Sequence, residues 1–534
     1  MIAALVGVLA AAAAGVAIVD RPGRRRAAAM AAAVLIAPAL IAGDQWHATQ
    51  VAELRSSPGL LIAALAVTGA LTVAGAGAFR RWPVLLPVLV LFVLPFRVPI
   101  AVGGEEANLL MPLYLVMAAG VAAALWREFA GDGDTEDPDG NPAADPGRAL
   151  PERDGGRDSA DRREGLSPAT PRGVAGWLRP LLAASVLLYA LGLFYSDDQS
   201  VGLQNLCFFL VPFAVVFALM TEVDWTARRL RVITAAILGL ALVCALIGFV
   251  EWGTRSLLWN QGVIRSNDFH VYFRVNSLFW DPNVFGRYLA LAVTIGAAGL
   301  IWAKRPRAMV ALTVTVWLLW LALLTTYSQS SFIALLAGLA ALAALRWHLK
   351  AVLGGLAALA VAVLLFGSFA GGVVKLDLGA LNKQTSGRAN LVEGGIDLFG
   401  QRPLAGYGPG SFSAAFKREV AGPNAPVTES HTEPVTVAAE QGAIGLALYV
   451  TLIVSALAAL GAGLRRVMPG LGAPPGARDP DRGPPPARAA IYAAFVAVLV
   501  HTVAYAGFLD DPITWVLIAI GYSLAFPCRD TSAA

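Results

Sequence analysis

The sequence predicts an all-α fold, a polytopic membrane helix bundle. Of its 534 residues, 57% are hydrophobic and only 14% are charged, and the mean hydropathy is +0.65. A water-soluble globule of this composition would expose large apolar patches. The apolar residues also fall into runs of roughly 16 to 21, the length of a helix that crosses a bilayer. We therefore expect about 14–15 spans and one large extracytoplasmic loop that contains short helices.

The predicted spans form three groups. N-terminal spans lie within residues 1–126, core spans within 179–370 and C-terminal spans within 434–528. The individual runs lie near residues 1–19, 27–43, 59–79, 83–97, 109–126, 179–195, 205–220, 232–252, 283–302, 309–327, 332–346, 351–370, 434–464, 490–508 and 513–528.

Polar stretches separate these groups. Residues 127–178 are rich in Asp, Gly, Pro and Arg and hold too few apolar residues to bury a core, so we expect a disordered cytoplasmic linker. Residues 465–489, rich in Pro and Gly, have the composition of a second cytoplasmic linker. Residues 371–433 form the longest late hydrophilic segment, which we interpret as the extracytoplasmic catalytic loop.

The positive charges predict the orientation, because loops rich in Lys and Arg stay on the cytoplasmic side. If every apolar run crosses the membrane, most of the Lys and Arg residues fall on the same side of it. Those loops contain Arg21 to Arg26, Arg80 and Arg81, Arg127 to Arg179, Arg228 to Arg231, Lys304 to Arg307, Arg346 to Lys350, Arg465 to Arg488, and Arg529. The C-terminus is then cytoplasmic. The arginines form no single basic face, so the net charge of +4 indicates topology and no nucleic-acid partner.

Arg274 is the first candidate for chemistry. Downstream of it, Asp281 and Pro282 have the pattern of an N-cap followed by Pro at the first helical position, so the next span begins there. Arg274 is therefore expected at a membrane face just before a helix. The alternative is an interfacial belt that Arg274 forms with its aromatic neighbours.

Arg388 is the second candidate. Apolar residues at 391, 392, 396, 398 and 399 predict a short amphipathic helix on the membrane with Arg388 in its first turn. Alternatively, Arg388 is a surface arginine paired with Glu393 or Asp397, an interaction worth only about 0 to 1 kcal/mol.

His431 is the third candidate. Ser430 and Glu433 have capping-box spacing and Pro434 follows them, so His431 is expected at the N-terminus of the next span. The positive end of a helix dipole favours a neutral imidazole, and its free N–H groups can bind phosphate. The alternative is a solvated loop histidine without a role.

Together these residues indicate glycosyl transfer from a lipid pyrophosphate. Two guanidinium groups can hold a pyrophosphate leaving group, while a neutral imidazole deprotonates the attacking hydroxyl. We expect Arg274 and Arg388 to bind the pyrophosphate and His431 to act as the base. Arg287, one turn inside its span, is a further candidate for phosphate contact, or it snorkels to the interface.

The sequence also resembles the O-antigen ligase and polymerase superfamily of bacterial envelope glycosyltransferases, over about residues 180–465. The matching motifs are Arg274 with Pro282 and Asn283, Gly387 and Arg388 leading into Pro403 to Phe412, and His431 with Gly442 and Gly445. In this family Asn, Ser or Gln usually follows the histidine, whereas Thr432 does so here. This departure leaves the acceptor less defined than the reaction.

The resemblance implies a multi-pass enzyme of the bacterial inner membrane. It would take a glycan from undecaprenyl pyrophosphate on the extracytoplasmic face and transfer it to a glycan, lipid or protein acceptor, with no cofactor and no metal. We expect Asn283, Glu433 and Glu440 to support the site. Glu440 falls inside a span, where an ionisable group faces protein or water.

Two further features are expected to be structural. The segment Gly406 to Gly410 resembles a phosphate loop, but it lacks the strand-to-helix context and the Lys-Ser that follow in such loops, so we interpret it as a turn beside the site. His501 lies among apolar residues in the middle of a span and is expected in the core.

Other functions stay open at this point. A polymerase of the same superfamily differs from a ligase in its acceptor. A transporter or flippase of lipid-linked glycans predicts charges along a central cavity and repeat symmetry, whereas here the candidates concentrate in one outer loop. A structural scaffold leaves the set of Arg274, Arg388 and His431 unexplained.

Overall fold

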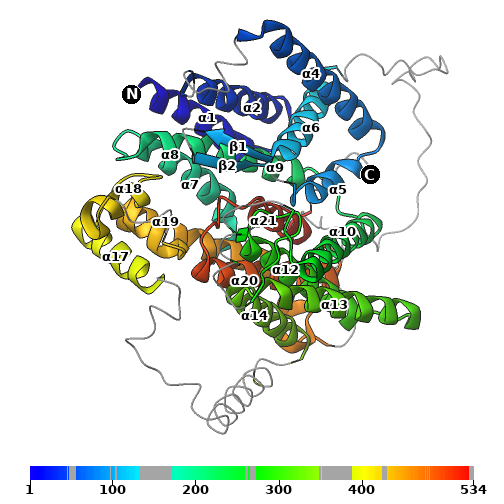
Figure 1. The fold of residues 1–534 in the computed structure, drawn as a ribbon. Helices are drawn as coiled ribbons and strands as arrows, with labels where there is room; N and C mark the ends of the chain where they lie inside the picture. Colours follow the sequence, from blue (N-terminus) through cyan, green and yellow to red (C-terminus); the bar gives the residue numbers. More distant parts are fainter. Residues whose placement is uncertain are drawn as a thin grey trace, which may run out of the picture.

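A computed structural model describes residues 1–44, 46, 56–96, 98–102, 105–130, 171, 173–258, 263–264, 267, 272–347, 350, 388–423, 430–474, 477, 479 and 482–527. Within these residues the chain is a helical bundle (Figure 1) with one antiparallel hairpin, β1 (Val98–Val102) paired with β2 (Glu105–Leu109). The predicted polytopic helical fold is confirmed, and the hairpin is a small addition to it. Helices dominate because a lipid-exposed backbone must satisfy its hydrogen bonds within its own segment.

Twelve helical segments of the described chain are long and apolar enough to cross a membrane. Eleven of them are or contain α1 (Ile2–Val19), α2 (Arg24–Asp44), α4 (Pro58–Arg81), α6 (Met111–Ala130), η2 with α7 (Gly173–Trp177 and Leu178–Gly192), α10 (Ala227–Thr254), α12 (Pro282–Ile301), α13 (Pro306–Thr326), α14 (Gln329–Arg346), α19 (Glu433–Gly461) and α20 (Pro485–Ala504). The remaining segment joins α8 (Gln199–Asn205), the π turn η3 (Leu206–Leu210) and α9 (Val211–Thr221).

Three predicted spans have a different outcome. The run at 83–97 was expected to cross the membrane, but its helix α5 (Leu85–Phe92) has only 8 residues, too few for a bilayer that needs about 20. The run at 513–528 forms α21 (Pro512–Ala525), a shorter apolar helix of 14 residues. The run at 351–370 lies outside the described residues, as do most of the linker at 127–178 and the first part of the catalytic loop.

Burial separates central helices from helices that face lipid. In the segment that contains α9, 78% of the residues in its most apolar 18-residue stretch are buried, compared with 6% for α4 and 17% for α13. All three are apolar around their circumference, so composition does not distinguish them; a helix of this kind is stable either inside a bundle or against lipid. α9 contacts α1, α2, α6 and α21, which makes it the centre of the N-terminal half.

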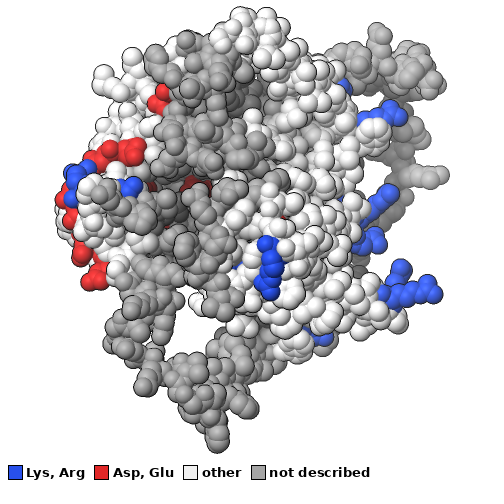
Figure 2. Space-filling view, in the orientation of Figure 1, with Lys and Arg blue, Asp and Glu red and all other residues white. Residues whose placement is uncertain are grey.

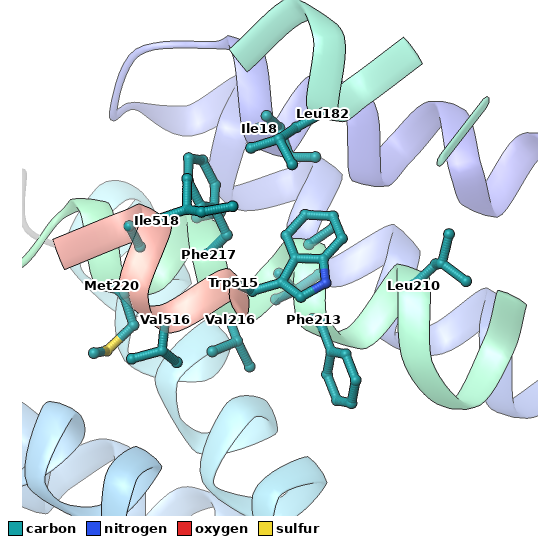
Figure 3. Packing of buried hydrophobic residues seen from close by; sticks show 14 of the residues in the cluster. Ile18, Leu182, Leu210, Phe213, Val216, Phe217, Met220, Trp515, Val516 and Ile518 are labelled. Carbon is teal, nitrogen blue, oxygen red and sulfur yellow. The ribbon is translucent and has the colours of Figure 1, made fainter. Parts of the chain in front are cut away.

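The core of this half is built around Trp515 of α21. Its ring is fully buried and lies edge-on to Phe217 of α9 at a centroid distance of 6.4 Å. Figure 3 shows Phe213 and Val216 of α9 beside it, with Ile18 of α1 nearby. The indole Nε1 donates to the carbonyl of Leu509 at 2.8 Å. The last described helix, α21, thus packs on α9, which also contacts the first two helices of the chain.

Basic side chains gather at one end of the bundle. Figure 2 shows Lys and Arg along the right edge and most acidic side chains on the left, beside the region of α18 and α19 in Figure 1. The ends of α2, α6 and α9 meet on the basic side, where buried Arg26 and exposed Arg127 both contact Glu222, at 3.5 and 2.9 Å. Two of the positively charged segments that the sequence analysis assigns to one side, those of Arg26 and Arg127, therefore lie together.

Two short helices and their turns complete the side opposite the basic end. α17 (Arg388–Gln401), α18 (Phe412–Phe416) and the π turn η4 (Lys417–Ala421) pack against one another, and α17 and α18 both contact α19. The predicted amphipathic helix that begins at Arg388 is therefore present, with Leu398 fully buried and Ile396 exposed. This small layer positions the candidate site.

Trp515→Ala should lower the thermal unfolding temperature of the detergent-purified protein markedly. A cavity of this size in a packed core costs about 3–5 kcal/mol. Trp317→Ala on α13 is the matched control, because Trp317 is 57% exposed and its replacement should cost no more than about 0.5 kcal/mol. Similar melting temperatures for the two variants would contradict the central role of Trp515.

Candidate functional site

Arg274 lies where the sequence predicts it, directly before the start of α12. The Asp281 side chain caps this helix by accepting from the N–H groups of Asn283 and Val284, at 2.6 and 3.3 Å. The half-buried Arg274 donates through Nε to the carbonyl of Thr326 at 3.0 Å and through Nη2 to Oδ1 of Asn283 at 3.0 Å. Arg274 and Asn283, which the sequence analysis named separately, are therefore joined by a hydrogen bond.

A residue that the sequence analysis missed holds this loop in place. Glu251, at the end of α10 and 2% exposed, accepts from the backbone N–H groups of Leu258, Asn276 and Ser277, at 3.2, 3.2 and 2.8 Å. Ser277 has a φ of 53°, a conformation in which consecutive N–H groups can converge on one anion. Its hydroxyl also donates to the carbonyl of Cys244 at 2.8 Å. Glu251 therefore fixes the turn that follows Arg274.

Arg287 forms a buried ion pair. Its Nη2 lies 2.7 Å from Oδ2 of Asp511, and the two side chains are 4% and 3% exposed. Its Nη1 donates to the carbonyl of Gly507 at 3.4 Å, while the N–H of the same glycine donates to Oε2 of Glu433 at 2.7 Å. Arg287 and Glu433 thus hold opposite sides of the loop between α20 and α21. A carboxylate neighbour offsets the guanidinium charge, and whether Arg287 contacts phosphate stays a prediction.

His431 directly precedes the cap of α19, which begins at Glu433 with Thr432 as its N-cap. The predicted capping box is wrong: the hydroxyl of Ser430 accepts from the N–H of Thr432 at 3.0 Å, and Glu433 turns away to Gly507. The cause is the left-handed backbone of His431, with φ of 57°, which folds Ser430 back over the helix start. The imidazole lies against the ring of Tyr505 at a centroid distance of 5.8 Å.

A buried polar cluster connects this histidine with the region of Arg274. The ring of Tyr505 also contacts His501, at a centroid distance of 5.7 Å. His501 is fully buried as predicted, but its Nε2 lies 3.3 Å from the hydroxyl of Ser330 and 3.2 Å from that of Ser331. Ser331 in turn donates to the backbone carbonyl of Asn283 at 3.3 Å. His431 and Arg274 are therefore joined through three helices that are far apart in sequence.

Arg388 begins α17, but its side chain lies outside the described part of the structure. The helix itself is held close to its neighbours by two glycines. A Cβ at Gly394 would overlap the ring of Phe416, and one at Gly395 would overlap the side chain of Val435. Because Val435 is in the first turn of α19 and His431 immediately precedes that helix, α17 lies beside the His431 end of α19.

The glycine-rich segment after α17 is a turn seated on a break in α19. At Gly442 the helix backbone becomes non-helical, with φ of 63°. The N–H groups of Tyr407 and Gly408 donate to the carbonyls of Ala439 and Glu440, at 3.0 and 2.8 Å. The Glu440 carboxylate accepts from the N–H groups of Gly410 and Phe412, both at 3.0 Å. In this structure the Glu440 carboxylate and two carbonyls of α19 thus occupy backbone N–H groups of the apparent phosphate loop.

The segment between α7 and α8 secures the other side of this turn, and the sequence analysis assigned it no role. The Ser196 hydroxyl donates to the carbonyl of Pro409 at 2.8 Å, and the N–H of Asp197 donates to the carbonyl of Tyr407 at 3.1 Å. Hydrogen bonds from Arg418 to Glu419 and Asp197 raise the pKa of the Arg418 guanidinium. A polar Tyr-Ser-Asp-Asp run between two apolar helices is the signal that marks this segment.

Glu433 and Glu440 both line a cavity of about 470 Å³ between α7, α8, α18 and α19. Arg274, Arg287, Asn283 and His431 are not part of its lining. Among the residues that the structure describes, no group of three or more His, Cys, Asp or Glu side chains comes together to hold a metal ion. The expectation of a reaction without metal or cofactor stays a prediction.

Comparison with protein families matches residues 314–450 to the family described as O-antigen ligase. This segment runs from within α13 to within α19, so it includes Arg388, the glycine-rich turn, His431 and Glu440 and leaves Arg274 outside. Comparison with curated proteins gives no match. The family match confirms the resemblance that the sequence motifs indicate.

Gly408→Ala should displace the turn from α19. The Gly408 backbone has φ of 94°, which strains an alanine by about 1–3 kcal/mol, and its Cβ would overlap the backbone of Ser196. Gly422→Ala is the matched control, because it has φ of 84° with no atom within 4 Å of the added Cβ. We expect faster limited proteolysis after α17 for Gly408→Ala alone. Equal proteolysis of both variants would count against the docked turn.

Glu251→Ala should loosen the turn that follows Arg274. It leaves buried N–H groups without their acceptor, at about 1–3 kcal/mol for each group. Glu251→Gln keeps one acceptor oxygen, so it should lose less stability in thermal unfolding. Glu393→Ala on the exposed face of α17 is a control that should leave the melting temperature unchanged. A Glu251→Ala protein as stable as this control would contradict the anchoring role.

Proposed function

We propose, from the match of residues 314–450 to the O-antigen ligase family, that this chain transfers a glycan from undecaprenyl pyrophosphate to an acceptor hydroxyl. The reaction takes place on the extracytoplasmic face of the bacterial inner membrane. The supporting observation is the contact path from His431 through Tyr505, His501 and Ser331 to Asn283, which carries Arg274. It joins the proposed base to the proposed anion-binding group across elements distant in sequence.

In this proposal the acceptor oxygen attacks the anomeric carbon of the donor sugar while His431 takes its proton. The new bond forms between that oxygen and the anomeric carbon, and the bond from the carbon to the phosphate oxygen breaks. The electron pair leaves with the pyrophosphate, whose growing charge Arg274 and Arg388 neutralise. Asn283 supports this step by fixing the Arg274 guanidinium at 3.0 Å.

The remaining residues of the site have positioning roles in the proposal. Arg287, paired with Asp511, and Glu433 hold the loop between α20 and α21, which presents Tyr505 to His431. Glu440 holds the glycine-rich turn against α19. These contacts tie Arg287, Glu433 and Glu440 to the loops that they position, as expected of ionisable groups inside a membrane bundle, which face protein or water.

A ligase and a polymerase of this superfamily share these steps and differ in the acceptor. In the ligase reaction the acceptor is a lipid, a protein or a completed glycan, and in the polymerase reaction it is another lipid-linked repeat unit. A transporter of the same lipid-linked glycan would instead leave the bond between sugar and pyrophosphate intact. The nature of the product therefore separates the three.

The purified protein in proteoliposomes should convert an undecaprenyl-pyrophosphate oligosaccharide and an acceptor into a glycan product detectable by mass spectrometry. His431→Ala should reduce transfer by about 10²–10⁴-fold, the usual contribution of a general base. Arg274→Gln should reduce it by about 10²–10³-fold through loss of charge stabilisation.

Arg465→Gln is the control for the loss of a positive charge, because Arg465 is exposed in the short helix η5 (Leu464–Arg466), which follows the end of α19 remote from His431, and it should retain transfer. Vesicles of one known orientation, given substrate on one side only, test the proposed face. Full transfer by His431→Ala, or an intact donor carried across the membrane, would refute the proposal.

A further inference from the structure

The cavity of about 470 Å³ holds chemistry that the proposed transfer step does not use. Its volume is within the range of about 300–1,000 Å³ typical of small-molecule sites. It extends from Lys417 and Gly410 at the glycine-rich turn, along α7 and α19, to Gly507 and Asp510 before α21.

The helix backbones around this cavity are irregular at several points. Asn205, in the lining, directly precedes the π turn η3, and Lys417, also in the lining, begins the π turn η4. Glu440 and Gln441 lie in the lining directly before the break at Gly442. Non-helical backbone at membrane depth is tolerated where it lines an aqueous cavity or is buried in protein, and π turns are frequent at functional sites.

The side chains of the lining suit a sugar better than a phosphate. Carboxyl groups come from Asp198, Glu433, Glu440 and Asp510, whereas among the described lining residues Lys417 alone supplies an ammonium group. A pyrophosphate would meet an excess of acidic groups. Hydroxyl and amino groups, by contrast, are the donors that carboxyl oxygens accept.

Neutral hydrogen-bonding groups and rings complete the lining. The amides of Asn205 and Gln441 can bond to hydroxyl groups as donors and as acceptors. Tyr189 and Tyr449 add rings that carry a hydroxyl, which combine an apolar face with a polar end. Leucine and valine side chains form the rest of the surface, including Leu448 and Val437. This alternation of apolar and hydrogen-bonding groups matches a pyranose ring.

The position of the cavity connects it with the proposed base. Glu433 and Ala506 both line it, and they lie two residues after His431 and one residue after Tyr505 in the chain. The ring contact between His431 and Tyr505 therefore lies within two residues, along the chain, of the cavity lining. Arg274, the proposed anion-binding residue whose side chain the structure describes, is not part of the lining, so the sugar and the phosphate held by Arg274 would occupy different places.

We propose that this cavity, lined by Asn205, Gln441, Glu440 and Asp510 between α7, α8, α18 and α19, binds a neutral or amino-substituted saccharide next to His431 and rejects acidic sugars. The inference rests on the proposed function for the role of that saccharide as a substrate. Its source is either the acceptor or the glycan of the donor. The binding itself needs no catalysis and is tested without it.

The test measures binding of free glucosamine, N-acetylglucosamine and glucuronate to the full-length protein in nanodiscs by saturation-transfer NMR. The first two should bind, and glucuronate should bind at least about tenfold more weakly, a difference of about 1.4 kcal/mol. Ala414→Phe fills the cavity from α18, where Ala414 is in the lining, and should abolish binding of both sugars. Ala447→Phe is the matched control, because Ala447 is exposed on α19.

A second variant guards against misfolding of Ala414→Phe. Gln441→Leu removes a hydrogen-bonding amide at similar volume and should weaken binding about two- to tenfold. Its control is Gln204→Leu on α8, next to Asn205 but not in the lining. Unchanged sugar binding in Gln441→Leu and in a folded Ala414→Phe protein, or equal affinity for glucuronate, would overturn the proposal.

Kinetics then distinguish the two sources of the sugar. If the acceptor occupies the cavity, Gln441→Leu raises the KM for the acceptor, and if the donor glycan occupies it, the KM for the lipid-linked donor rises. Inorganic pyrophosphate binding should be unchanged in Ala414→Phe and weakened in Arg274→Gln. Sugar binding without any transfer activity would refute the proposed function and leave the saccharide site standing, whereas transfer without sugar binding would do the reverse.

Discussion

The rest of the site depends on the two hydrogen bonds that the Glu440 carboxylate accepts from the glycine-rich turn and the start of α18. This carboxylate accepts the N–H groups of Gly410 and Phe412 from inside a membrane helix, and the helix opens directly after it at Gly442. An opened turn leaves backbone carbonyls without their usual partners, and Tyr407 and Gly408 supply the N–H groups that satisfy two of them. A polar loop is thereby fastened to an apolar helix without leaving buried groups unpaired.

The position of the glycine-rich turn on α19 also determines how closely α7, α8, α17 and α18 can pack around it. Pro409 fits between α7 and α8 because Gly192 and Gly202 carry no side chain there: a Cβ on either would lie 2.5 to 2.6 Å from Pro409. α18 follows immediately, and α17 packs between α18 and the start of α19. The small helical layer, the N-terminal half and the helix that follows His431 therefore meet at one place.

Three polar residues of the site have partners of opposite or complementary character, as a low-dielectric environment favours. Arg287 is paired with Asp511, Arg274 bonds to Asn283, and Glu251 receives a set of backbone N–H groups. Such pairing contributes little net stability, since desolvation offsets much of the attraction. Its value is geometric, because a proposed base and a proposed anion-binding arginine are useful only at fixed positions.

Composition and short motifs were enough to determine the class of protein, most helices and several helix starts. Runs of apolar residues predict spans because lipid demands a length and a hydropathy that do not depend on the neighbours. The cap at Asp281 was predictable because it involves only adjacent residues. Tertiary structure alone decided three contacts: the hydrogen bonds from the glycine-rich turn to Glu440, the ion pair of Arg287 with Asp511, and the backbone hydrogen bonds that Glu251 accepts. Each joins segments distant in sequence, and no local pattern specifies which buried carboxylate meets which backbone donor when several are available.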